Sequence, residues 1–79
     1  MGETRTVTGV ITLVQESRFK LVDTHGRSKL FTLGHGAAID PEDLGPILHS
    51  GHPVTITFEA TKGLIAGTVS EIRPEGRAR

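Results

Sequence analysis

The sequence predicts a small all-β protein, a closed barrel of five short strands with one short helix between the third and fourth strands. Its 79 residues are enough for one domain. Five stretches alternate apolar with polar residues and are rich in Val, Ile and Thr, as half-buried strands are. Because so few short strands would hold little core and expose two edges in an open sheet, we expect the sheet to close on itself.

Residues 4–14 form the first expected strand, because Thr and Val favour a pleated backbone. Its apolar residues fall on both faces, with Val7, Gly9, Ile11 and Leu13 on one and Val10 and Val14 on the other. A strand of this kind changes its surroundings along its length. Gly9 is the expected place of the bend or bulge that allows the change.

Residues 18–23 and 29–33 are expected to form a hairpin. Asp23 suits the first position of a type I turn, and Gly26 suits the left-handed conformation that follows it. This turn would place Phe19 opposite Phe31, and the core-facing residues would be Phe19, Leu21, Phe31 and Leu33. The outward face would then carry Arg18, Lys20, Val22, Ser28, Leu30 and Thr32.

A short helical segment should begin near Asp40, which is a good helix cap, and Pro41 is favourable in the first turn. Pro46 lacks an amide donor, so we expect it to interrupt the helix and to start a second turn over residues 46–49. Gly51 should end the segment. The residues expected to plug one end of the barrel are Leu44, Ile47 and Leu48.

Residues 54–59 show the clearest alternation in the chain and are the expected fourth strand. Residues 64–72 are the expected fifth strand, with Gly67 as a further candidate for a bulge. The remaining C-terminal residues are Pro, Gly, Ala and charged residues. We therefore divide the chain into one barrel domain, residues 1–73, and a flexible tail, residues 74–79.

The order of these elements, with a long bent first strand and a helix after the third strand, is that of an OB-fold-like barrel. An SH3-like barrel is the main alternative, but it usually has no helix at that position. Several short motifs add a family resemblance: Thr8-Gly9-Val10, Phe19-Lys20-Leu21, Gly26, Ile47-Leu48-x-x-Gly51-x-x-Val54-Thr55-Ile56, and Lys62-Gly63-Leu64-Ile65. On these motifs the chain resembles the small bacterial OB-fold domains of the translation initiation factor one and cold-shock type. The resemblance implies binding of single-stranded RNA or DNA across the second and third strands.

The chain has no net charge, because nine basic residues balance nine acidic ones. The charges are unevenly placed, however, since the hairpin is basic and residues 40–43 are acidic. The side chains expected to contact a phosphate backbone are Arg18, Lys20 and Lys29, with Arg27 and Lys62 at the rim. The chain has no Trp or Tyr and its three Phe fit core positions, so binding would be weak, tolerant of sequence and sensitive to salt.

Two other interpretations of the same strands stay open. The basic residues are also typical of an ordinary solvated strand face, where Lys blocks pairing between sheet edges. The outward apolar residues Val22 and Leu30, with Thr32 beside them, could instead form a protein-interaction patch without nucleic-acid binding. The leading hypothesis is therefore a non-catalytic binding module for single-stranded nucleic acid, and the alternative is a protein-interaction module that uses the same face.

Several function classes are not expected. The absence of Cys excludes disulfides and thiolate metal sites, and His49-x-x-His52 lacks a third ligand, so we expect no metal or other cofactor. No constellation of nucleophile and base indicates an enzyme, and so small a barrel should have no cavity for a small-molecule substrate. Neither a membrane span nor a signal peptide is evident, which favours a cytoplasmic location without membrane contact.

Overall fold

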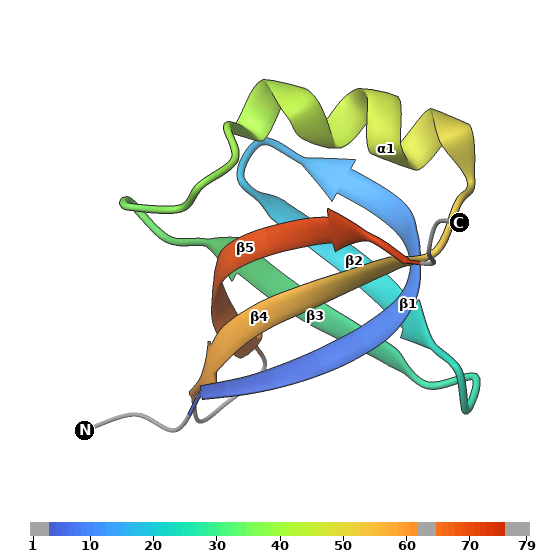
Figure 1. The fold of residues 1–79 in the computed structure, drawn as a ribbon, viewed down its shortest axis with the longest axis horizontal. Helices are drawn as coiled ribbons and strands as arrows, with labels where there is room; N and C mark the ends of the chain where they lie inside the picture. Colours follow the sequence, from blue (N-terminus) through green and yellow to red (C-terminus); the bar gives the residue numbers. More distant parts are fainter. Residues whose placement is uncertain (1–3, 62–64, 76–79) are drawn as a thin grey trace.

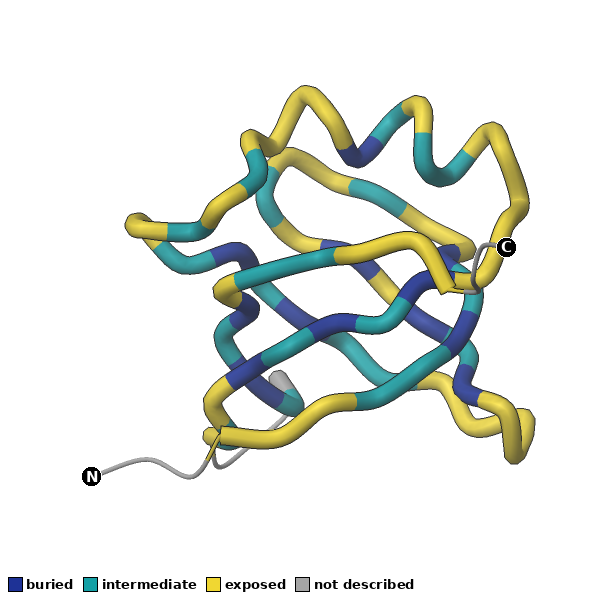
Figure 2. Tube along the Cα trace, viewed as in Figure 1, coloured by how far each residue is buried: buried dark blue, intermediate teal, exposed yellow. Residues whose placement is uncertain are grey.

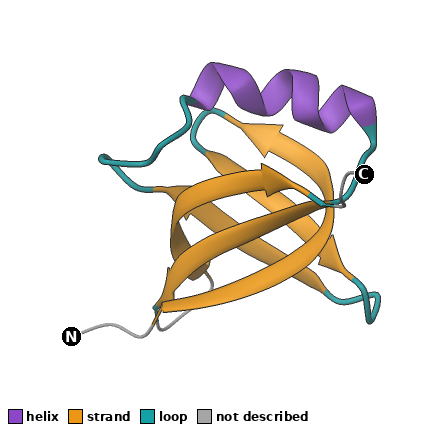
Figure 3. Ribbon diagram, viewed as in Figure 1, coloured by secondary structure: helices purple, strands orange, loops and turns teal. Residues whose placement is uncertain are grey.

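Five strands follow one another around a closed barrel in a computed structural model, which describes residues 4–61 and 65–75 (Figures 1 and 3). The elements in chain order are β1 (Thr4–Gln15), β2 (Arg18–Asp23), β3 (Ser28–Leu33), the 3-10 helix η1 (Pro41–Asp43), α1 (Leu44–Ser50), β4 (Val54–Ala60) and β5 (Ile65–Pro74). The strand order around the barrel is β1-β2-β3-β5-β4. Neighbouring strands are antiparallel except for the parallel pair β3 and β5. The predicted all-β, OB-fold-like barrel with a short helix between strands three and four is confirmed.

The long strand β1 closes the barrel because it pairs with two different strands. Residues 4–9 pair with β4, and residues 9–15 pair with β2, so that Gly9 has a partner on each side. Gly9, the predicted place of a bend or bulge, is where β1 changes partner, but the bulge itself lies between Ile11 and Leu13. The extra residue there reverses the side-chain alternation beyond it. The prediction that Leu13 faces the core is therefore wrong.

The β2–β3 hairpin has the predicted register. Phe19 lies opposite Phe31, and the core-facing Phe19, Leu21, Phe31 and Leu33 are all buried. In the turn, the Gly26 amide donates to the Asp23 carbonyl oxygen at 2.9 Å, and Gly26 has a positive φ of 82°. The turn chemistry and the alternation agree on one register, which is why local sequence was sufficient to predict it.

Buried residues recur along all five strands (Figure 2), and the apolar ones form one hydrophobic cluster. Three aromatic rings lie in contact: Phe19 stacks on Phe31 with centroids 5.7 Å apart, and Phe31 meets Phe58 edge to face at 4.9 Å. Offset and edge-to-face arrangements are the favourable ones for aromatic rings. The remaining buried apolar residues are Ile11, Leu21, Leu33, Leu44, Val54, Ile56 and Val69.

The helix α1 covers one end of the barrel (Figure 1). Leu44 is buried, and Ile47 and Leu48 pack against the core as predicted. Two successive helical segments are present as expected, but the second begins at Leu44 and not at Pro46. Pro46 lies in the first turn of α1, where backbone amides make no hydrogen bond within the helix, so proline is tolerated there. The helix ends as predicted at Gly51, which adopts a left-handed φ of 70°. Neither α1 nor η1, the helices of the described residues, is long and apolar enough to cross a membrane.

The last strand carries two irregularities. Leu30 and Phe31 of β3 pair with Ile65 and Gly67, so Ala66 is an extra residue beside the glycine predicted to mark a bulge. A second shift against β4 lies between the partners of Thr57 and Phe58. The strand continues to Pro74, and Glu75 follows with its amide donating to the Pro53 carbonyl oxygen at 3.0 Å. Residues 76–79 of the predicted tail lie outside the described part of the chain.

Candidate nucleic-acid interface

The outer surface of β1, β2 and β3 contains five of the eight side chains that the sequence assigned to binding: Arg18, Lys20, Val22, Leu30 and Thr32. We call it the β1–β3 face, and its residues are Val10, Leu13, Gln15, Arg18, Lys20, Val22, Ser28, Leu30 and Thr32. Cross-strand pairing aligns them in three rows: Leu13-Lys20-Leu30, Gln15-Arg18-Thr32 and Val10-Val22-Ser28. No carboxylate belongs to this set. The face therefore combines two cations with an apolar centre.

Leu13 is the feature of this face that the sequence analysis missed. Its side chain is 44% exposed, the only large hydrophobic side chain that is exposed among the described residues. It lies across from Lys20, and the other neighbour of Lys20 is Leu30. The bulge in β1 turns Leu13 outward, and no local signal in the sequence marks that bulge. Lys20 thus lies between two leucines on neighbouring strands.

The predicted apolar patch has the expected orientation. Val22, Leu30 and Thr32 are half-buried, and neither Val22 nor Leu30 belongs to the hydrophobic residues that pack against the core. A small hollow of about 50 Å³ lies between Leu13, Gln15, Arg18, Phe19, Lys20 and Leu30. This hollow could receive a small group but not a whole base, since ligand sites usually span roughly 300–1,000 Å³.

The five basic residues predicted to act together do not share one surface. Arg18 and Lys20 lie on the β1–β3 face, whereas Arg27 lies in the exposed β2–β3 turn. Lys29 is paired with the buried Leu21, which gives it the opposite, inward-facing alternation. Lys62 lies outside the described residues. The cationic character of the β1–β3 face thus comes from Arg18 and Lys20.

Asp23, the acidic residue of the hairpin, is held by the turn. Its carboxylate oxygen Oδ1 accepts hydrogen bonds from the backbone amides of Arg27 and His25, both at 2.9 Å. The hydrogen bond from the Arg27 amide is the main reason why the pKa of Asp23 is lowered from its ordinary value. Lys29 lowers this pKa further by its charge. Asp23 therefore serves the geometry of the turn, and its side chain is not part of the β1–β3 face.

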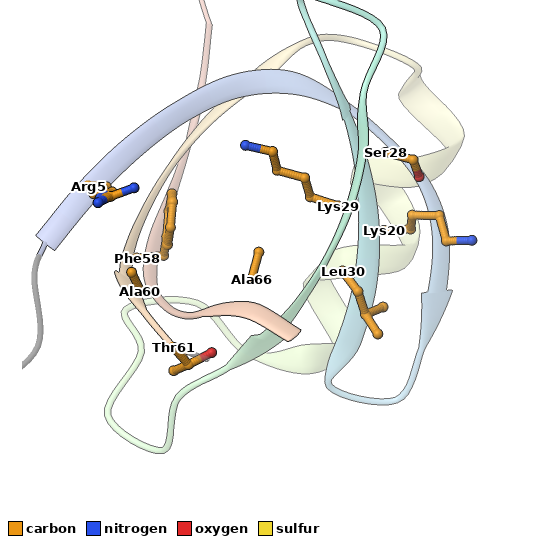
Figure 4. A pocket seen from close by; sticks show the side chains of 9 residues that line it. All are labelled: Arg5, Lys20, Ser28, Lys29, Leu30, Phe58, Ala60, Thr61 and Ala66. Atoms are coloured by element: carbon orange, nitrogen blue, oxygen red, sulfur yellow. The ribbon is translucent and has the colours of Figure 1, made fainter. Parts of the chain in front are cut away.

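An open cavity of about 580 Å³ lies at the end of the barrel (Figure 4). Its lining residues are Arg5, Lys20, Ser28, Lys29, Leu30, Phe58, Ala60, Thr61 and Ala66. Figure 4 shows Lys29 extending into the cavity from one wall, with Arg5 and Phe58 on the opposite wall. Lys20 and Leu30 point away from its centre. So small a barrel was expected to have no cavity for a small-molecule substrate, and closure of the strands leaves this open one.

Glu16 lies in the turn between β1 and β2, at the edge of the β1–β3 face, and most other acidic side chains of the described residues lie elsewhere. Asp40, Glu42 and Asp43 surround η1, while Glu59, Glu71 and Glu75 belong to β4, β5 and the residue after β5. Glu71 pairs with Arg73 at 3.1 Å on the surface. The zero net charge thus conceals a dipolar molecule, with the β1–β3 face cationic and the helix and the β4–β5 wall anionic.

The described residues contain no group of three His, Cys, Asp or Glu side chains that could hold a metal ion. His52 donates its backbone amide to the Ser50 hydroxyl at 3.1 Å, as part of the chain turn after α1. No known family model matches the chain, and a comparison with curated proteins finds no match. The fold itself is a small five-stranded barrel compatible with an OB-like fold.

Proposed function

We propose that this protein is a non-catalytic binding module, and that its β1–β3 face binds single-stranded RNA or DNA weakly and with little sequence preference. One observation carries the proposal: the strand register brings Arg18 and Lys20 onto one open face that has no carboxylate. Cations on an open strand surface can follow a phosphate backbone. We also propose that the domain is of the initiation factor one and cold-shock type, and that the protein is cytoplasmic.

The type of binding follows from what the face lacks. All three Phe side chains are buried, and the chain has no Trp or Tyr, so no aromatic ring of the β1–β3 face is available to stack on bases. Stacking contributes roughly 1–3 kcal/mol per base in single-strand binding proteins. Without it, affinity depends on the phosphate contacts of the cations. Binding should therefore decrease steeply as salt increases.

Replacement of Lys20 tests the proposal. Lys20→Ala should weaken the binding of a mixed-sequence single-stranded RNA by roughly three- to tenfold at low salt, and should lower the slope of log affinity against log salt by about 0.7. Fluorescence anisotropy at several salt concentrations measures both quantities. Arg73→Ala is the matched control, because Arg73 is an exposed cation on β5 that is already paired with Glu71. Equal slopes for Lys20→Ala and the unmodified protein would contradict the assigned contact.

A protein partner on the same face is the second candidate, and the exposed side chain of Leu13 beside Leu30 favours it. Leu13→Ser removes apolar contact without changing charge. It should leave phosphate-driven RNA binding within about twofold of the unmodified protein, since the cations remain. If the protein does not bind single-stranded RNA even at low salt, the nucleic-acid proposal fails and the apolar centre of the face becomes the leading site.

A further inference from the structure

The turn between β1 and β2 contains a residue in a strained backbone conformation. Glu16 has a positive φ of 57°, and among residues 4–61 and 65–75 it is the only residue other than glycine with a positive φ. The other two left-handed positions in this part of the chain are occupied by Gly26 and Gly51. Glycine tolerates this conformation because it has no Cβ atom, whereas a glutamate there raises the free energy of the folded state.

The neighbouring strands hold the turn in this shape. The carbonyl oxygen of Ser17, the next residue, accepts a hydrogen bond from the Leu33 amide of β3 at 2.8 Å. Gln15 and Arg18, on either side of the turn, are paired across β1 and β2. The backbone at Glu16 is therefore fixed by three strands and cannot relax. Strain of this kind persists where the surrounding structure over-determines it, and it is concentrated at functional sites.

The carboxylate of Glu16 is exposed and accessible to a ligand. Within the described residues it forms no hydrogen bond and no ion pair, although Arg18 follows only two positions later. A carboxylate beside Arg18 repels a phosphate group, so phosphate binding gives no reason for a glutamate at this position. A ligand group that presents hydrogen-bond donors does give one, because an ionised carboxylate only accepts hydrogen bonds.

The position of Glu16 places it beside the proposed path of the nucleic acid. Arg18 and Lys20 lie on the β1–β3 face, and Glu16 precedes Arg18 by two residues. Ser17 lines a surface hollow together with Asp40, so the turn has a second carboxylate near it. A nucleotide whose phosphate contacts Arg18 would therefore direct its base toward the turn, and not its next phosphate.

We propose that Glu16 recognises the Watson–Crick edge of a guanine base and gives the β1–β3 face a modest preference for guanine. This inference depends on the proposed function, because it assigns a base contact to the strand that Arg18 and Lys20 hold. Guanine presents two adjacent donors on this edge, N1–H and N2–H, which match the two oxygens of one carboxylate. Each of the other bases presents one donor group there, next to acceptors that a carboxylate repels. Single-stranded bases are commonly recognised on this edge.

The test uses uridine hexamers that carry one guanosine or one inosine at the same internal position. Inosine lacks only the 2-amino group of guanosine, so the two hexamers differ by a single donor group. Fluorescence anisotropy at low salt gives the dissociation constants, with the all-uridine hexamer as the reference. We expect the guanosine hexamer to bind about fivefold tighter than the inosine hexamer, as the loss of one hydrogen bond to a charged group implies.

Substitutions of Glu16 separate the carboxylate from the backbone strain. Glu16→Gly should abolish the preference for guanosine over inosine, and should raise the midpoint of thermal unfolding by about 4 °C because glycine relieves the strain. Glu16→Gln keeps the strain but loses the charge, so most of the preference should disappear without a gain in stability. Glu59→Gln is the matched control and should leave the ratio unchanged, because Glu59 is an exposed carboxylate of β4, outside the β1–β3 face.

The outcomes separate the inference from the proposed function. If the unmodified protein binds the guanosine, inosine and all-uridine hexamers equally well, the inference is overturned while the proposed function stands. The inference is also overturned if Glu16→Gly keeps the guanosine-to-inosine ratio of the unmodified protein. If no hexamer binds even at low salt, the proposed function fails, and the inference fails with it.

Discussion

The barrel leaves no room for a side chain at Gly67. A Cβ atom at this position would lie 2.3 Å from Cδ2 of Phe58 and 2.8 Å from the carbonyl oxygen of Glu59. The first neighbour is a buried ring of the aromatic core, and the second is backbone of β4, so neither can easily move away. The close approach of β5 to β4 here depends on glycine.

Replacement of Gly67 by alanine should therefore destabilise the protein. We expect Gly67→Ala to lower the free energy of unfolding by about 2 kcal/mol, the usual effect of an overpacked core. Urea denaturation followed by circular dichroism measures this change. Gly36→Ala is the control, because a Cβ atom there meets no atom within 4 Å. Equal stability of the two variants would show that β5 can shift away from Phe58.

The short helix α1 is stabilised by the residue that ends it and by its packing on the barrel. Gly51 terminates it in a left-handed conformation with φ of 70°, and Pro46 lies in its first turn. Gly45 also lies in this first turn, where a Cβ atom would meet nothing within 4 Å. The helix has only seven residues, so its stability comes mainly from Leu44, Ile47 and Leu48 against the barrel. Its cap and its packing together keep it over the barrel end.

Two alanine substitutions in this one segment should have opposite effects. Gly51→Ala should cost about 1 kcal/mol of stability, because an L-residue is strained in the left-handed region. Gly45→Ala should be neutral or stabilising by up to about 0.5 kcal/mol, because alanine loses less backbone entropy in a helix. Thermal unfolding of both variants measures the difference. A stabilising effect of Gly51→Ala would contradict the left-handed end of α1.

The whole barrel is held by pairings between distant parts of the chain. β1 pairs with β4, and β3 pairs in parallel with β5, so each closing contact joins segments on either side of α1. The loss of one closing pair exposes the shared core and two strand edges at once. We infer that the five strands unfold together, whereas α1, which packs mainly on β1, is a more independent unit.

Native-state hydrogen exchange tests this cooperativity. Amides at the centres of the five strands should show protection free energies that agree within about 0.5 kcal/mol of one another and of global unfolding. The amides of α1 should exchange through a smaller opening, at lower protection. Separate protection levels for the β2–β3 hairpin and the β4–β5 pair would mean that the barrel opens in two parts.

Much of the fold could be predicted because its signals are local. Alternation identified all five strands to within a few residues, and the turn at Asp23–Gly26 set the hairpin register. The outward orientation of Arg18 and Lys20 follows from that register. These features depend on residues that are neighbours in the chain, so the sequence contains their cause.

The rest of the site was decided by pairing between remote strands. The bulge between Ile11 and Leu13 exposes Leu13, and the number of residues in each partner strand, not the local pattern, determines where it lies. Barrel closure brings Arg5 to the same cavity as Lys29. The alternation along each strand shows only that each residue lies at an inward-facing position. The sequence by itself therefore determined the elements, the hairpin and the cations of the open face. Only the tertiary structure decided the apolar centre of that face and the cationic cavity, because both require strands that are distant in the chain to meet.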